Sequence, residues 1–345
     1  MRILIPTDAW TPQVNGVVTT LATLAAELRA TGHEPVVVGP DAFRTLPMPG
    51  YPEIRLAVTP YRHLAALAEA AASDAVHVPV EGPIGLAARR LCLRRGWRFT
   101  TSFNTRAGLY AEMRFGVPER YVLGLQRRFH APAAGVLVQT ESLERDLGAA
   151  GFTGIRRWAR AVDTALFRPR PCDPLLRDLE RPVFLYVGRV STEKNLDAFL
   201  GLDLPGTKLV VGDGPQLAAY RARYTRAVFT GYRHGEELAR YYAASDVFVF
   251  PSRFETYGLV LLEALSSGLP VAAFPVHGPA DVVGDAPVGV LDEDLRAAAL
   301  RALTISRESC RAFALRHTWR RAAQEFGAAL EPIHQGSRAS RAEAA

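Results

Sequence analysis

Lysine, cysteine and long apolar runs are scarce in this sequence, and each scarcity argues against a class of protein. The three cysteines, Cys92, Cys172 and Cys310, are widely spaced, odd in number and without a CxxC pair. This pattern argues against a disulfide framework and a structural zinc site, and it predicts reduced thiols in the cytoplasm. No apolar run approaches the roughly 20 residues of a membrane-spanning helix. The N-terminal apolar segment is short and Asp8 interrupts it, so a secretory signal is not expected.

Positive charge is present mainly as arginine: of 41 basic residues only Lys194 and Lys208 are lysines, and the net charge is +6. Arginines are dense between residues 86 and 130, and residues 114–130 also carry apolar side chains at amphipathic spacing. This basic stretch favours a peripheral position on the anionic cytoplasmic face of a membrane. Solvated or core-packed helices also explain part of the pattern. Nucleic acid is the competing partner, but no nucleic-acid-binding motif accompanies the arginines, so it is not expected.

A length of 345 residues predicts about two domains. Short apolar strands alternate with helical segments, beginning with a strand over residues 2–6 and, in the second half, a strand over residues 183–187. This alternation is typical of an α/β fold with doubly wound parallel sheets. Ligands of such sheets lie beyond the carboxyl ends of the strands, so the loops after the strands are the places to look for a site.

The stretch over residues 246–271 predicts a buried strand, a loop and a helix that begins near Gly258. This geometry aims the backbone N–H groups of a helix N-terminus at an anion. Glu255 and Glu263 flank that N-terminus, and because carboxylates repel a phosphate they are suited to hold the hydroxyls of a sugar or a ribose. A nucleotide-sugar has this composition, because its diphosphate joins two hydroxyl-bearing rings. The same residues are also compatible with an ordinary strand–helix unit that has a capping glutamate.

Residues 251–271, with the pattern PSR-ETYGLV-LEAL-SG-PV, resemble the donor-site signature of family 4 glycosyltransferases, retaining enzymes of the GT-B fold. Three further segments match the family: GR-xxxx-K at 188–194, GDGP at 212–215 and the segment at 160–169, where Ala161 replaces the usual glycine. The resemblance implies two Rossmann-like, doubly wound domains that face an interdomain cleft. It also implies hexosyl transfer from a nucleotide-sugar, with no metal or other cofactor.

The donor site that follows from this resemblance draws on both halves of the chain. Arg189 and Lys194 would neutralise the diphosphate and stabilise its charge as it leaves. Glu255 would face the sugar and Glu263 the ribose. The remaining donor-binding candidates are the glycine of the first loop, the GDGP turn and the backbone of the α-helix start: Gly16, Asp213, Gly214, Tyr257, Gly258, Leu259 and Val260.

The candidate acceptor loop, residues 102–106, departs from the family pattern. Relatives usually carry SFHTR where this chain reads SFNTR. Asn104 can hydrogen-bond a sugar hydroxyl, but it cannot exchange a proton near neutral pH as an imidazole can. Asn104 is counted with the catalytic candidates, and Asp8, Asn15 and Arg106 are the further acceptor-side candidates.

We expect an acceptor-side domain over residues 1–168 and a donor domain over 169–317. A terminal helix at 318–333 would cross back to the first domain, ahead of a polar tail at 334–345. The predicted reaction is retaining transfer from a nucleotide diphosphate sugar of UDP-glucose or UDP-glucuronate type to a lipid such as diacylglycerol. Two alternatives remain open: transfer to a soluble polyol or a polysaccharide, and a catalytically silent nucleotide-sugar binder because of Asn104.

Overall fold

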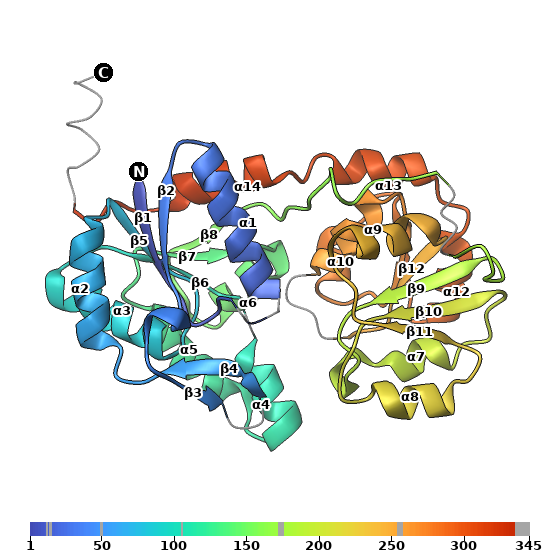
Figure 1. Cartoon of the computed structure of the whole chain (residues 1–345), viewed down its shortest axis with the longest axis horizontal. Coiled ribbons are helices and arrows are strands. Elements are labelled where there is room, and N and C mark those ends of the chain that lie inside the picture. Colours follow the sequence, from blue (N-terminus) through green and yellow to red (C-terminus); the bar gives the residue numbers. More distant parts are fainter. Residues whose placement is uncertain are drawn as a thin grey trace. The chain divides into compact units, whose positions relative to one another are not determined.

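The computed structural model describes residues 1–11, 13, 16–48, 51–104, 106–171, 176–253 and 258–334. The chain divides into two compact units (Figure 1): unit 1 comprises Met1–Ala159 and Trp319–Ala345, and unit 2 comprises Arg160–Thr318. The first division falls after residue 159, whereas the sequence analysis placed it after residue 168. The last helix groups with unit 1 after the whole of unit 2 has been traversed.

Unit 1 contains a six-stranded parallel sheet with the strand order β2-β1-β5-β6-β7-β8, and a separate antiparallel pair, β3-β4. Its strands are β1 (Arg2–Pro6), β2 (Glu34–Val38), β3 (Thr45–Met48), β4 (Tyr51–Ala57), β5 (Ala75–Val78), β6 (Thr100–Ser102), β7 (Gly135–Val138) and β8 (Ile155–Arg157). Its helices are α1 (Gly16–Ala30), α2 (Tyr61–Ala71), α3 (Pro83–Arg95), α4 (Ala107–Phe115), α5 (Glu119–His130), α6 (Glu141–Ala149) and α14 (Trp319–Ala329), with the 3-10 turn η1 (Pro40–Ala42). Strands β5 and β7 are buried along their whole length, as expected when both faces of a parallel sheet are covered.

Helix α14 completes the core of unit 1. The ring of Phe326, which is fully buried, packs edge-on against His77 (centroids 4.8 Å apart) and Trp158 (5.3 Å). The chain after α14 is also held, because Arg98 N donates to Ile333 O (3.0 Å). The terminal helix is therefore an integral part of this unit.

Unit 2 contains a second six-stranded parallel sheet, with the order β11-β10-β9-β12-β13-β14. This is the 3-2-1-4-5-6 arrangement of a Rossmann fold. The strands are β9 (Val183–Val187), β10 (Thr207–Val211), β11 (Val228–Gly231), β12 (Val247–Phe250), β13 (Val271–Ala273) and β14 (Gly289–Leu291). The helical elements are η3 (Thr192–Lys194), α7 (Leu196–Leu200), α8 (Leu217–Arg223), α9 (Gly235–Ala244), α10 (Leu259–Ser266), α11 (Pro279–Val282), α12 (Leu295–Ala302) and α13 (Arg307–Ala314).

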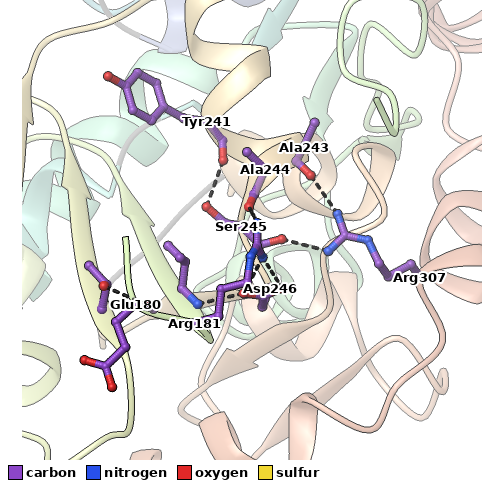
Figure 2. A network of polar contacts seen from close by, with 10 residues as sticks. Glu180, Arg181, Tyr241, Ala243, Ala244, Ser245, Asp246 and Arg307 are labelled. Atoms are coloured by element: carbon purple, nitrogen blue, oxygen red, sulfur yellow. Dashed lines mark hydrogen bonds and ion pairs between the residues drawn. The ribbon is translucent and has the colours of Figure 1, made fainter. Parts of the chain in front are cut away.

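A polar network fixes the amino ends of the central strands of unit 2, as Figure 2 shows. Arg181 Nη1 donates to both carboxylate oxygens of Asp246 (2.7 and 2.8 Å). Val183 N also donates to Asp246 Oδ2 (2.7 Å). Arg307 donates to the carbonyls of Ser245 (2.7 Å) and Ala243 (2.9 Å). These contacts join the starts of β9 and β12 to α13, and they leave the carboxyl ends of the same strands for ligands.

The residues that lead into unit 2 are anchored to its helices. Arg311 Nη1 donates to Phe167 O and to Ser266 O (both 2.8 Å), and Arg311 Nη2 donates to Thr164 O (2.9 Å). Ser266 Oγ also donates to Phe167 O (2.6 Å). Because Ser266 ends α10 and Arg311 lies on α13, residues 160–168 group with unit 2 instead of unit 1.

Candidate functional site

The carboxyl edge of the unit 2 sheet holds most of the donor-site candidates. The chain leaves β9 for β10 on one side of the sheet, and β12 pairs with β9 on the other, so the strand order reverses between β9 and β12. Ligands of doubly wound sheets bind in the crevice at this reversal. The loops after β9 and β12 therefore flank the expected site.

The loop after β9 carries the two predicted cations. Arg189 is exposed, and Lys194 is half-buried at the end of η3. Asn195 then adopts a left-handed conformation (φ +53°), and its Nδ2 donates to Pro251 O (3.1 Å) in the loop after β12. This hydrogen bond joins the two loops, so the cations and the start of the following loop belong to one edge.

The GDGP turn lies against the same loop. Gly188 N donates to Val211 O (3.1 Å), and Val190 N donates to Asp213 O (2.8 Å). At Gly212 (φ +152°) a Cβ atom would lie only 1.9 Å from Gly188 O, so this close approach of two backbones requires glycine. Asp213 is exposed and Gly214 half-buried beside it.

Helix α10 begins at the same edge. Gly258 occupies its N-cap in the left-handed conformation (φ +64°) and is buried, whereas Leu259 and Val260 in the first turn are half-buried. The first N–H groups of a helix have no partner within it and carry its positive dipole end, which suits a phosphate. Glu255 and Tyr257 lie outside the described residues, so their roles remain predictions.

Glu263 projects from α10 as a half-buried carboxyl group. Tyr242 donates its hydroxyl to Glu263 Oε2 (2.9 Å). Burial raises the pKa of Glu263 to about 7, and the tyrosine hydrogen bond opposes this rise. A carboxyl group that titrates near neutrality can accept a hydrogen bond from a hydroxyl and, when protonated, can also donate one.

In unit 1, Asp8 follows β1 and lies at the carboxyl edge of that sheet. Its Oδ1 accepts from Ile84 N (2.9 Å) and its Oδ2 from Gly85 N (3.0 Å), so the carboxylate caps the N-terminus of α3. Burial raises the pKa of Asp8 to about 6, against the effect of these backbone hydrogen bonds. A Cβ atom at Gly82 would lie 2.4 Å from Asp8 Cγ, so the loop can approach the carboxylate only because residue 82 is glycine.

The other acceptor-side candidates have separate surroundings. Asn104 Nδ2 donates to Pro79 O (2.8 Å), which joins the loops after β6 and β5. Arg106 forms an ion pair with Asp146 of α6. Gly16 opens α1, is exposed and has open space where a Cβ would stand. Asn15 lies outside the described residues.

Glu81 and the helix residues that hold it were not predicted from the sequence. Glu81 Oε1 accepts from Gln126 Nε2 (3.0 Å) and is paired with His130 Nε2 (3.1 Å). His130 Nδ1 in turn lies 2.8 Å from Thr101 Oγ1 on β6. The signal that could have found Glu81 was its place directly after a buried strand and before Gly82-Pro83. Its partners 45 and 49 residues later gave no local signal.

Two absences hold for the described part of the chain. No group of three histidine, cysteine, aspartate or glutamate residues there could hold a metal ion; Asp294, in the acidic run at 292–294, instead caps α12 through the N–H groups of Arg296 (3.0 Å) and Ala297 (3.1 Å). Within the same residues, every helix is too short or too polar to cross a bilayer.

Comparison with known proteins extends the match over both units. A family model described as "Glycosyltransferase Family 4" matches residues 14–166, and one described as "Glycosyl transferases group 1" matches residues 181–306. A GDP-mannose-dependent alpha-mannosyltransferase of Mycobacterium tuberculosis (strain CDC 1551 / Oshkosh) is 32% identical over 317 residues, which cover 84% of this chain and 83% of the relative. An alpha-monoglucosyldiacylglycerol synthase of Streptococcus pneumoniae (strain ATCC BAA-255 / R6) is 28% identical over 347 residues, which cover 88% and 78% of the two chains.

A solved structure shows the same architecture. Sucrose-phosphate synthase from Thermosynechococcus elongatus has a TM-score of 0.74 at 20% identity, over 95% of this chain and 97% of that one. The similarity in structure confirms the fold class predicted from the sequence, and the family matches confirm the resemblance. The chain therefore belongs to glycosyltransferase family 4 and is a hexosyltransferase of the GT-B fold that uses a nucleotide-sugar donor.

Proposed function

We propose that this protein transfers a hexose, with retention of anomeric configuration, from a nucleotide diphosphate sugar to a lipid acceptor such as diacylglycerol. The observation that carries the donor half is the edge between β9 and β12, where Arg189, Lys194 and the N-terminus of α10 lie on adjoining loops. All three contribute positive potential, as a diphosphate leaving group requires. Loss of the glycosidic bond leaves a nucleotide diphosphate, whose extra negative charge these groups would stabilise.

Each remaining donor residue has a proposed role in this scheme. The N–H groups of residues 257–260 would bind the diphosphate, and the Asp213-Gly214 turn would lie beside the nucleotide. Glu255 would face the sugar and Glu263 the ribose hydroxyls. Gly16, which opens α1, is a further proposed donor-binding residue. Because arginine and lysine supply the positive charge, the proposed reaction needs no metal ion.

The identity of the donor is the first point to test. The sequence favoured a UDP-linked sugar, whereas the mycobacterial relative is named for its dependence on GDP-mannose. We therefore place GDP-mannose first and UDP-glucose second among the donors to be assayed.

A lipid acceptor is supported by the surface of α3 and α5. Leu86 and Leu93 of α3 and Tyr121 and Leu125 of α5 are exposed apolar residues among the arginines of this basic stretch. The two helices are joined, because Arg89 of α3 donates to the carbonyls of α5 residues Arg128 (3.0 Å) and Phe129 (2.9 Å). Exposed apolar side chains among arginines suit the anionic face of a membrane. The name of the pneumococcal relative includes a diacylglycerol product.

The test is turnover of GDP-mannose, UDP-glucose and UDP-glucuronate, with and without dioleoylglycerol in anionic mixed micelles. Glycolipid that forms only when the lipid is present is the expected result. Nucleotide diphosphate released equally without lipid would instead favour a soluble polyol or polysaccharide acceptor. Tight nucleotide binding with no turnover on any acceptor would favour the silent binder suggested by Asn104.

A further inference from the structure

The unit 1 sheet has its own strand reversal, and two carboxylates flank it. The chain leaves β1 for β2 on one side, and β5 pairs with β1 on the other, so the reversal lies between β1 and β5. Asp8 follows β1 and Glu81 follows β5. The position after β9 at the corresponding reversal of unit 2 is occupied by Arg189, a cation. The general rule that ligands bind at such reversals applies to both sheets.

Helix α5 orients Glu81 through one of its two carboxylate oxygens. Gln126 Nε2 (3.0 Å) and His130 Nε2 (3.1 Å) both lie on Oε1. Both partners are buried, Gln126 with 6% and His130 with 1% of its surface exposed. The side chain of Glu81 is 24% exposed, and Oε2 has no hydrogen-bond partner among the residues that the structure describes. One oxygen is thus fixed by two groups of the protein and the other faces solvent.

The charge at this edge selects the kind of group that can bind. Asp8 is close enough for the charge of Glu81 to contribute to the rise in its pKa, and the Asp8 oxygens are occupied by the N–H groups of α3. A phosphate or carboxylate would be repelled by Glu81, whereas a hydroxyl can donate to its exposed oxygen. A hydrogen bond to a charged group contributes about 1.5–3 kcal/mol, which corresponds to roughly 10- to 100-fold in affinity.

We propose that Glu81 is a specificity-determining residue that accepts a hydrogen bond from a hydroxyl of the acceptor at the reversal between β1 and β5. The acceptor group that reaches this edge is therefore uncharged and hydroxyl-bearing, such as a glycerol or sugar moiety, and is not a phosphate. This inference rests on the proposed function, since it assigns the acceptor of the same transfer reaction. Under this proposal the loops after β1 and β5 in unit 1 bind neutral hydroxyls, whereas the loops of unit 2 bind the anionic donor.

The substitution Glu81→Gln separates this role from a purely structural one. The amide oxygen of glutamine can still accept from Gln126 and His130, so the contacts that join the loop to α5 are retained. The exposed oxygen becomes an NH2 group, which donates and no longer accepts. Glu69→Gln is the matched control, because Glu69 is an exposed carboxylate of α2 in the same unit, paired with Arg95.

The first measurement uses saturation-transfer NMR to detect the binding of three soluble probes in the presence of nucleotide diphosphate. Glycerol and methyl α-D-glucopyranoside carry neutral hydroxyls, and glycerol 3-phosphate adds a phosphate. We expect the wild type and Glu69→Gln to bind at least one neutral probe more tightly than glycerol 3-phosphate. Glu81→Gln should weaken that binding about tenfold or more. Equal binding by wild type and Glu81→Gln, preference for the phosphate, or no binding of either neutral probe would overturn the proposal.

A second measurement separates this proposal from the proposed function. With any acceptor that supports transfer, Glu81→Gln should raise the KM for the acceptor about tenfold and leave the KM for the nucleotide-sugar unchanged. A rise in both constants, or in neither, would count against Glu81. Failure of the lipid proposal would look different: the wild type itself would make no glycolipid, while the probe binding and its loss in Glu81→Gln would persist.

Discussion

The two lysines of this chain have different surroundings, which gives a direct comparison at the scale of single residues. Lys194 is half-buried at the end of η3, at the proposed diphosphate site. Lys208 lies on β10 and donates through Nζ to the carbonyls of Leu200 (2.6 Å) and Leu202 (2.5 Å). The first lysine thus lies at the proposed donor site, and the second joins β10 to the end of α7 and the turn after it.

Lys194→Ala should lower kcat/KM about 100-fold or more, because the leaving diphosphate loses a cation, and should leave the melting temperature nearly unchanged. Lys208→Ala should lower the free energy of unfolding by about 1–3 kcal/mol, through two lost charge-assisted hydrogen bonds, and should keep most of the activity. Steady-state kinetics and urea unfolding of both variants test this pair. Near-normal turnover of Lys194→Ala would remove Lys194 from the donor site.

The carboxyl group of Glu263 should make stability depend on pH. Because burial raises its pKa to about 7 from an ordinary value of 4.5, the folded state holds this proton over a pH range in which the unfolded state has lost it. The contribution of Glu263 to the free energy of unfolding therefore falls as the pH rises from about 4.5 to about 7, and is level outside that window. Urea unfolding of the wild type and Glu263→Gln at several pH values should show a difference that changes only in this window. A constant difference would mean that the pKa of Glu263 is not raised.

At the scale of elements, the loops after β9 and β10 depend on close backbone contact. Gly212 leaves no room for a side chain, since a Cβ would lie 1.9 Å from Gly188 O. Gly124 in α5 has nothing within 4 Å of the corresponding position. The same chemical change should therefore have opposite effects in the two places.

Gly212→Ala should lower the free energy of unfolding by about 1–3 kcal/mol, because the new Cβ would clash with Gly188 O and the backbone must shift to relieve the strain. The shift should also weaken nucleotide binding. Gly124→Ala should raise stability by up to about 1 kcal/mol, since alanine favours a helix interior. Thermal unfolding and nucleotide titration of the two variants give the comparison. Unchanged nucleotide affinity in Gly212→Ala would separate this turn from the donor site.

Elements with local signals could be predicted, and contacts between distant residues could not. The strand and helix around residues 246–271, and the cap that Asp294 gives α12, follow from neighbouring residues. By contrast, the tyrosine partner of Glu263 and the helix partners of Glu81 come from other elements. Residues 114–130, expected from the sequence as one amphipathic stretch, are divided between α4 and α5 by a break at Gly116 (φ +67°) and Pro118. Side-chain partners across a parallel sheet depend on strand order, which a single sequence does not specify.

At the scale of the whole molecule, two separate cores predict two unfolding units. Phe326 is fully buried in unit 1, and Phe199 is fully buried in unit 2. Truncation of a buried phenylalanine costs about 3–5 kcal/mol, and multidomain chains need not unfold in one step. Phe326→Ala should therefore lower the midpoint temperature of one calorimetric transition, and Phe199→Ala should lower that of the other. If both variants lowered the midpoint temperature of a single transition by the same amount, the two units would unfold as one cooperative unit.

The return of α14 to unit 1 sets an order of events during synthesis. A ribosome makes unit 2 as the unbroken stretch 160–318, whereas unit 1 lacks Phe326 until residues beyond unit 2 have emerged. The half that is started first is thus the half that is completed last. Until then, His77 and Trp158 lack the aromatic partner that covers them. A nascent chain of which only residues 1–318 have emerged should therefore carry a folded unit 2 beside an incomplete unit 1, a state that chaperones are suited to hold.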